Sequence, residues 1–287
     1  MSYFLSTELR HTLFGSFRAL TRLLYFTTVF FSGALVVLIL RAVLPISTYR
    51  RLRPVISRKV GRVLLCASNI RVRREGSLPP DGALVVANHV SWADSFTFLS
   101  ELGCRFMVNH RYGSIIGFSA VLKTVGVAFI NRMSMKALGQ AQEVMRRILQ
   151  HGATLMVFPE GRTSRGGSVR KFKSALLQVP VDLKRPVYWA SICYETSRSW
   201  PPASVVIGWE EWPPLLTHIY RAFHAPRITC RIRYGHEPIW APDRKTLAEM
   251  LHTAVSAQHI AMPQLPADAL HSIDVVKKVA RRLVYGD

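Results

Sequence analysis

Short apolar runs that end abruptly in polar residues constrain the fold of this 287-residue chain more than any other feature. The run 83–87 is bounded by turn residues and followed at once by Asn88 and His89, which predicts a buried strand. We expect further strands at 127–130, 154–158, 187–193, 205–207 and 228–234. The last of these runs alternates apolar with polar residues, which predicts an edge strand with one wet face.

A helix is predicted between two of these runs, at 134–152. Its apolar residues recur at helical spacing, Ser134 can cap its start, and His151 with Gly152 is typical of a helix end. Strands that alternate with helices favour a largely parallel sheet. The fold class expected is therefore α/β, a mostly parallel sheet with flanking helices.

His89 and Asp94 lie just past the run 83–87, where they have two interpretations. In a parallel sheet, residues beyond the carboxyl end of a strand line the crevice in which ligands bind. His89 would then be a general base, and Asp94, in the first turn of the next helix, would orient its imidazole. In the alternative, His89 is a polar loop residue and Asp94 stabilises the helix dipole. This segment alone leaves both open.

Two more polar blocks share this position. Arg132 follows the run 127–130, and Glu160, Gly161 and Arg162 follow the run that ends at Phe158. A lone arginine would be an ordinary surface charge, but three polar blocks at three strand ends predict one shared crevice.

The charge balance indicates an anionic partner. Lys and Arg number 38 against 17 Asp and Glu, a net charge of +21, and 49% of the residues are hydrophobic. The charge fits nucleic acid, an anionic membrane surface or acidic carriers, but the positive mean hydropathy favours a membrane surface over nucleic acid. Four scattered cysteines without metal-ligand spacing favour a reducing compartment and no metal site.

The uncharged apolar stretch 23–40 has the minimum length for a membrane-spanning helix. It has three interpretations: a spanning helix, a helix in the membrane interface, or a buried core helix. If the helix spans, the arginines that follow it place the body of the protein on the cytoplasmic face, at the inner membrane in a bacterium. The segment 115–130 is also apolar and fits core, a membrane-dipping element or the wall of an acyl pocket.

Three parts are expected along the chain. Residues 1–60 would form a membrane-anchoring helical segment, 61–262 the catalytic domain, and 263–287 a basic carboxyl-terminal helix after two prolines.

The ordered blocks resemble the motifs of the lysophospholipid and glycerol-phosphate acyltransferase family, over about residues 60 to 240. The family patterns NHxxxxD, GxxFIxR and FPEGTRS match, in order, Asn88, His89 and Asp94; Gly126, Phe129, Ile130 and Arg132; and Phe158, Pro159, Glu160 and Gly161. A fourth block, an apolar strand opened by proline, is similar to 185–190. Two departures stand out. Arg162 and Thr163 are exchanged relative to the commonest form of the third block, and a proline-glycine pair ahead of the second is missing.

The resemblance implies transfer of a fatty acyl group from acyl-CoA or acyl carrier protein to a lysophospholipid hydroxyl, with no other cofactor. The most direct acceptor is 1-acylglycerol-3-phosphate (lysophosphatidic acid), and glycerol-3-phosphate, a lyso-aminolipid or another lysophospholipid are alternatives. His89 and Asp94 would be catalytic. The substrate-binding residues implied are Asn88, Gly126, Arg132, Glu160, Gly161 and Arg162.

Roles that the resemblance leaves open concern Ser91 and a basic segment. Ser91 is a minor candidate nucleophile, although the chain has no G-x-S-x-G elbow. Arg170, Lys171 and Lys173, expected at the head of a helix, fit a binding role or a solvated face equally. A non-catalytic basic membrane adaptor is the rival from another class.

Overall fold

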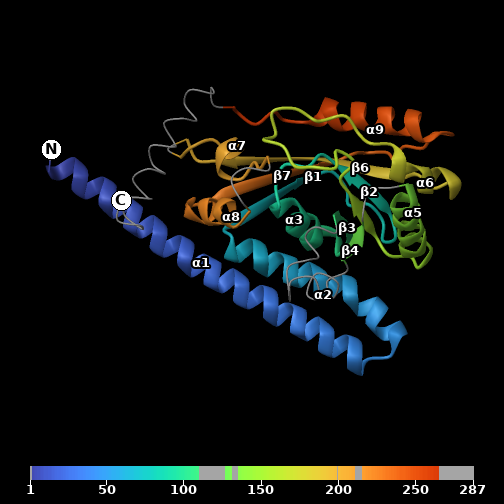
Figure 1. The fold of residues 1–287 in the computed structure, drawn as a ribbon, viewed down its shortest axis with the longest axis horizontal. Coiled ribbons are helices and arrows are strands. Elements are labelled where there is room, and N and C mark those ends of the chain that lie inside the picture. Colours follow the sequence, from blue (N-terminus) through green and yellow to red (C-terminus); the bar gives the residue numbers. More distant parts are fainter. Residues whose placement is uncertain (1, 110–126, 131–134, 199, 211–214, 265–287) are drawn as a thin grey trace.

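The computed structural model describes residues 2–109, 127–130, 135–198, 200–210 and 215–264 (Figure 1). In this part of the chain seven strands form one sheet in the order β1-β7-β6-β2-β5-β3-β4. The strands are β1 (Ile70–Glu75), β2 (Leu84–Ala87), β3 (Arg105–Asn109), β4 (Val127–Ile130), β5 (Leu155–Val157), β6 (Val187–Thr196) and β7 (Ile228–Tyr234). All neighbours are parallel except β6 and β7. The predicted α/β class with a mostly parallel sheet is confirmed.

Helices cover both faces of the sheet. The described helices are α1 (Ser2–Val43), α2 (Ile46–Ala67), α3 (Ala93–Leu102), α5 (Met135–Gln150), η2 (Ala175–Leu177), α6 (Gln178–Asp182), α7 (Ala203–Val206), α8 (Leu215–His224) and α9 (Arg244–Gln258). Apolar side chains of α2, α3, α7 and α8 pack on one face of the sheet, and those of α5, η2, α6 and α9 pack on the other.

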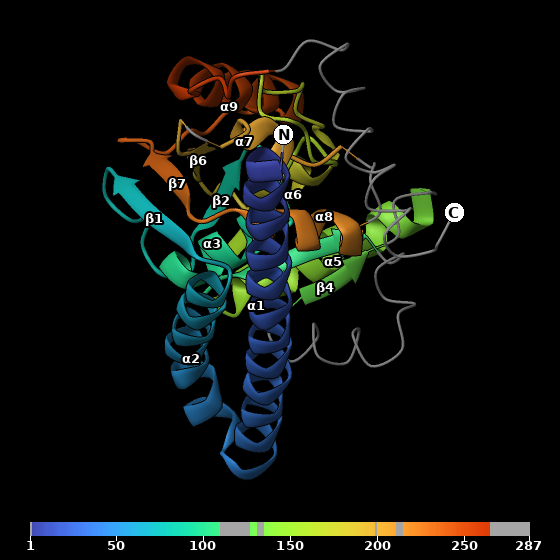
Figure 2. The same ribbon diagram turned by 90° about the vertical axis from the view of Figure 1, so that its left-hand side faces the viewer.

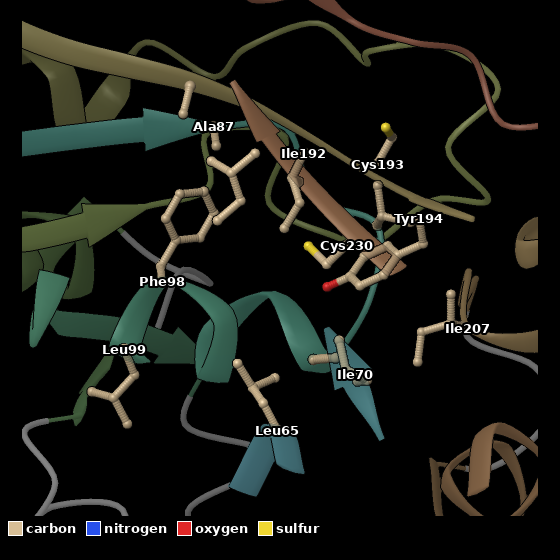
Figure 3. Packing of buried hydrophobic residues seen from close by; sticks show 14 of the residues in the cluster. Leu65, Ile70, Ala87, Phe98, Leu99, Ile192, Cys193, Tyr194, Ile207 and Cys230 are labelled. Carbon is tan, nitrogen blue, oxygen red and sulfur yellow. The ribbon is translucent and has the colours of Figure 1, made fainter. Parts of the chain in front are cut away.

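The central strand β2 is buried on both faces, as its continuous apolar sequence predicts. Val85 and Ala87 point into the core beneath α3, while Leu84 and Val86 point into the core beneath α5 and α9. Figure 3 shows the first of these cores, in which Phe98 of α3 lies beside Ala87 and Ile192. Because close-packed side chains hold β2 from both sides, the residues that follow it start from a fixed position.

Helix α1 lies along α2 and α8 and also leaves an apolar face uncovered (Figures 1 and 2). The segment Phe14–Val43 is long and apolar enough to cross a membrane, and its most apolar window is only 22% buried. Phe26 and Phe30 pack against α8 and α2 residues, whereas Phe17 and Leu24 are exposed. Arg22 donates to the carbonyl oxygens of Phe223 (2.8 Å) and Pro226 (3.1 Å), so the guanidinium ties α1 to the end of α8.

Two strand predictions were wrong in detail. The segment 205–207 lies largely in the short helix α7, which begins directly after Pro201 and Pro202. A run of three apolar residues is too short to distinguish the two-residue period of a strand from the 3.6-residue period of a helix. Strand β7 alternates buried and half-buried residues as expected, but it is not an edge strand, since β1 pairs with it on the side away from β6. Its Arg231 and Arg233 pair with Glu195 and Glu75, so the wet face carries ion pairs.

The remaining predictions concern one helix, one strand, the division of the chain and segments outside the described residues. The helix predicted at 134–152 is α5, and Gly152 has the left-handed conformation (φ +68°) expected beyond its end. Strand β3 was not predicted. The expected division into 1–60, 61–262 and 263–287 stays a prediction, with α2 running on to Ala67. The basic helix expected at 267–284, most of the segment 115–130 and Ser134 lie outside the described residues.

Gly103 provides a test of how α2 is held on the domain. It ends α3 with a φ of +60°, and a Cβ there would overlap the carbonyl oxygen of Pro54 in α2. We expect Gly103→Ala to lower the free energy of unfolding by about 2 to 4 kcal/mol, through left-handed strain and this overlap. The control is Gly139→Ala in α5, where a Cβ meets nothing within 4 Å. It should stabilise by about 0.5 to 1 kcal/mol. Chemical denaturation in neutral detergent measures both, and equal effects would contradict this packing.

Candidate active site

His89 and Asp94 form a hydrogen-bonded pair at the carboxyl end of β2. The Nδ1 of His89 lies 2.8 Å from Oδ2 of Asp94. Since a carboxylate only accepts, Nδ1 carries the proton and Nε2 of the neutral imidazole keeps its lone pair. The imidazole stacks on the Phe158 ring at 4.0 Å between centroids, and the His89 side chain is 19% exposed. The contact to Asp94 therefore leaves Nε2 as the nitrogen that can act as a base.

The Asp94 carboxylate is fully buried and accepts four hydrogen bonds. Its Oδ2 accepts from His89 and from the backbone N–H groups of Val90 (2.7 Å) and Ser91 (3.0 Å). Its Oδ1 accepts from the hydroxyl of Tyr194 on β6, at 2.7 Å. Buried carboxylates are tolerated where every lone pair has a donor. Asp94 also lies in the first turn of α3, as predicted, so both interpretations of this residue describe the same position.

The third block fixes the backbone of His89 on both sides. The His89 N–H donates to Oε1 of Glu160 at 2.9 Å. The His89 carbonyl accepts from the N–H of Ser164 at 2.9 Å and from its hydroxyl at 3.2 Å. Because β2 and β5 are parallel neighbours, the residues beyond their carboxyl ends meet directly. The expected convergence of the first and third blocks is therefore present.

The Asn88 side chain holds two strands together, and its expected substrate contact stays a prediction. Its side-chain amide donates to the carbonyl of Ile192 at 2.9 Å, and its Oδ1 accepts from the Ile192 N–H at 2.8 Å. The residue is 1% exposed. Its amide therefore clamps the end of β2 to β6 and is turned away from solvent.

Gly161 and Arg162 lie in an irregular segment that follows β5. Gly161 has a φ of +78° and closes a turn by donating to the carbonyl of Phe158 at 3.1 Å. A glycine is required there because other residues rarely adopt this conformation. The segment stays irregular until η2, so Arg170, Lys171 and Lys173 lie in a loop. The Arg162 side chain is exposed at the same edge of the sheet.

Gly126 and Arg132 lie outside the described residues. The strand between them, β4, runs parallel to β3, which is parallel to β5. Its carboxyl end at Ile130 is thus on the same edge as His89.

Two contributors, Tyr194 and Ser164, were missed by sequence reasoning. Tyr194 lies mid-strand in β6, and Ser164 lies beyond the part of the third block that was assigned a role; neither belongs to a spacing that signals the Asp94 or His89 contact. Arg170 forms an ion pair with Glu210, and its charge and backbone N–H act on Glu160. No group of three or more His, Cys, Asp and Glu side chains could hold a metal ion within the described ranges.

Burial raises the pKa of Glu160 to about 7, against the opposing effects of the His89 and Arg170 amides and the Arg170 charge. The residue is 3% exposed, and its Oε2 is buried without a hydrogen-bond partner in the described structure. The carboxylate is therefore costly to ionise in the folded protein. Such strain is typical of functional positions.

The raised pKa predicts how stability depends on pH. Between the ordinary pKa of 4.5 and about 7, the folded protein keeps a proton that the unfolded chain releases. Stability therefore falls as pH rises through this window. Glu160→Gln cannot ionise, and its amide oxygen still accepts from His89, so it should be more stable than the parent by about 1 to 3 kcal/mol above neutral pH.

Denaturant unfolding of both proteins across this window measures the difference, which should vanish near pH 4.5. Glu237→Gln, an exposed control, should follow the parent. A constant difference between Glu160→Gln and the parent at every pH would rule out this explanation.

Several known proteins are similar to this chain in sequence. Residues 69–193 match the family model described as Acyltransferase. A 1-acyl-sn-glycerol-3-phosphate acyltransferase of Neisseria meningitidis is 31% identical over 206 residues, 69% of this chain and 78% of that protein. A lyso-ornithine lipid O-acyltransferase of Pseudomonas aeruginosa is also 31% identical, over 205 residues, 67% of this chain and 73% of that protein.

Among solved structures, the crystal structure of the 1-acyl-sn-glycerophosphate (LPA) acyltransferase, PlsC, from Thermotoga maritima has the same fold. The TM-score is 0.61 at 24% identity, covering 85% of this chain and 97% of that one. With 31% identity over more than three quarters of a curated relative, the chain belongs to the lysophospholipid and glycerol-phosphate acyltransferase family and is an O-acyltransferase.

Proposed function

We propose that this enzyme acylates the free hydroxyl of a lysophospholipid, with His89 as general base. Nε2 of His89 takes the proton of the acceptor hydroxyl while the hydroxyl oxygen bonds to the thioester carbonyl carbon. The carbon–sulfur bond then breaks, and the leaving thiolate takes the proton from the imidazolium. Asp94 keeps the imidazole in the correct tautomer and stabilises its charged form. The observation that carries this proposal is the 2.8 Å contact between Nδ1 and a fully buried, fully hydrogen-bonded carboxylate at the sheet's carboxyl edge.

The proposed acceptor is 1-acylglycerol-3-phosphate, which would become phosphatidic acid. The names of the Neisseria relatives support it. The arginines of the second and third blocks also support it, because guanidinium groups bind phosphate through paired charge-assisted hydrogen bonds. Arg132 is the first candidate for this contact, and Arg162, exposed at the same edge, is the second.

A second acceptor has equal sequence support. The Pseudomonas relative named for lyso-ornithine lipid is as similar to this chain as the Neisseria one. That lipid carries no phosphate, so it would have no use for a phosphate-binding arginine. The proposed donor is acyl-CoA or acyl carrier protein, both of which are anionic and suit the charge of +21.

We place the enzyme at a membrane with its catalytic domain on the cytoplasmic side. The apolar exposed face of α1 and the net positive charge support this, because apolar insertion and attraction to anionic lipid act on the same surface. The lipid acceptor in the membrane would then be within reach of His89.

His89→Ala tests the catalytic proposal. Without the base, thiol release from acyl-CoA or acyl carrier protein in the presence of lysophosphatidic acid should fall by about 100-fold to 10,000-fold. The control is His236→Ala, an exposed histidine that should keep parental activity. Unchanged turnover in a folded His89→Ala protein would overturn His89 as the base, and a parent protein that released no thiol with either donor would favour the non-catalytic adaptor alternative.

A panel of acceptors, combined with Arg132→Ala, tests the acceptor. With lysophosphatidic acid, the variant should raise the Michaelis constant of the acceptor by about tenfold or more and leave that of the donor nearly unchanged. Arg227→Ala removes an exposed arginine elsewhere and should change neither. Equal increases for donor and acceptor would argue against phosphate binding by Arg132. Turnover of lyso-ornithine lipid but not lysophosphatidic acid would reassign the acceptor.

A further inference from the structure

A cavity lies at the opposite end of the sheet from His89. Its volume is about 620 Å³, and its lining includes Gly103 and Arg105 at the start of β3 and Thr154 just before β5. His89 and Glu160, by contrast, follow the carboxyl ends of β2 and β5. From Thr154 to Glu160 the chain covers on the order of 20 Å in extended conformation. One phosphate group therefore cannot occupy the cavity and the active site together.

The cavity wall is strongly basic. Its titratable cationic and imidazole side chains are Arg50, Arg51, Arg53, Arg105, Arg147 and His151. The lining carboxylate, Asp81, is 82% exposed and lies 3.8 Å from Arg58, outside the arginine group. Arg147 has its own partner in Glu143 at 2.7 Å. The wall thus combines several positive charges with little that neutralises them.

Arg53 and Arg105 bring this charge into the protein. Arg53 is only 5% exposed, and the Nε of Arg105 is buried without a hydrogen-bond partner in the described structure. Burial, and after it the nearby charge of Arg105, lower the pKa of Arg53 to about 10. No carboxylate within the described ranges forms an ion pair with Arg105. A bound anion would satisfy the buried donor and relieve the repulsion.

Backbone packing holds these side chains in place. Pro54 of α2 lies directly against Gly103, with no room for a Cβ between them. The same helix packs closely along α3, where Gly61 lies against Ser100. The arginines of α2 and Arg105 of β3 therefore face each other without needing a ligand to assemble them.

The surroundings of the cavity identify the source of the anion. At the turn that joins α1 to α2, Ile39, Val43 and Ile46 are 51%, 70% and 45% exposed. Helices α1 and α2 form a two-helix arm, and Figure 2 shows this turn at its far end. Arg50 follows Ile46 by about one helical turn, roughly 6 Å along α2. An apolar tip with arginines one turn behind it suits insertion among acyl chains with the guanidinium groups at phosphate depth.

We propose that this cavity binds the phosphate headgroup of an anionic membrane lipid, at a site separate from the active site. Arg105, Arg53 and Arg50 are the expected contacts. The site would hold the two-helix arm and the catalytic domain against the same lipid and so fix the orientation of the enzyme on the membrane.

The test is calorimetric binding of short-chain phosphatidylglycerol to the full chain in neutral detergent, with no acyl donor present. Arg105→Gln should weaken binding by at least about tenfold, as expected for a lost charge-assisted contact. Arg146→Gln is the matched control. It removes a charge from α5 beside the lining residue Arg147 but pairs with Asp182 at 2.9 Å, outside the cavity. It should change binding less than about twofold.

Arg50→Gln combined with Arg51→Gln, both exposed, repeats the measurement if Arg105→Gln does not fold. Equal weakening by cavity and control variants would show a diffuse charge effect and overturn the proposal. Inorganic phosphate forms the second arm: if it binds as tightly as the lipid, the cavity takes free phosphate and the lipid assignment is wrong. Because binding is measured without turnover, neither outcome depends on the acyl-transfer proposal.

Discussion

The buried carboxylate of Asp94 is the interaction on which the site depends. An ionised carboxylate without water is tolerable only when its oxygens accept enough hydrogen bonds. Here the donors come from the turn after β2, from the imidazole of His89 and from Tyr194 on β6. To deliver them, the turn must fold over the first turn of α3 and β6 must lie beside β2. The requirement of one carboxylate therefore specifies a strand pairing, a helix start and the direction of the imidazole.

Glu160 makes the opposite compromise. Its Oε1 holds the backbone of His89, but burial leaves its Oε2 without a partner and raises its pKa to about 7. A protein selected for stability alone would place a neutral side chain there. The choice of a strained acid at this position is consistent with a site in which a substrate completes the unsatisfied hydrogen bonds.

Sequence reasoning succeeded where a local rule decides the outcome. The apolar runs predicted β2, β4, β5 and β6, and the parallel sheet then brought the first and third blocks together, because the carboxyl ends of parallel neighbours meet. It failed where partners are distant in the chain. Tyr194 lies a hundred residues from Asp94, and no spacing announces the contact. That β7 lies one strand in from the edge follows from its pairing with β1, not from its own alternation. The clamp that Asn88 forms with Ile192 joins residues about a hundred positions apart, and its place in the motif does not signal it.

Charge is divided between the two ends of the sheet in different ways. At the carboxyl end, two bases have an acid partner: His89 pairs with Asp94, and Arg170 pairs with Glu210. At the amino end, arginines of α2 and β3 face one another, and the surplus of the +21 charge is concentrated without equal compensation. Folding alone does not favour such a concentration, because like charges that approach in a partly buried cavity repel. An external anion at the proposed site would offset that repulsion. The α1–α2 pair carries the exposed apolar face and three of the five arginines that line the cavity, which is why we propose a membrane lipid as the source of that anion.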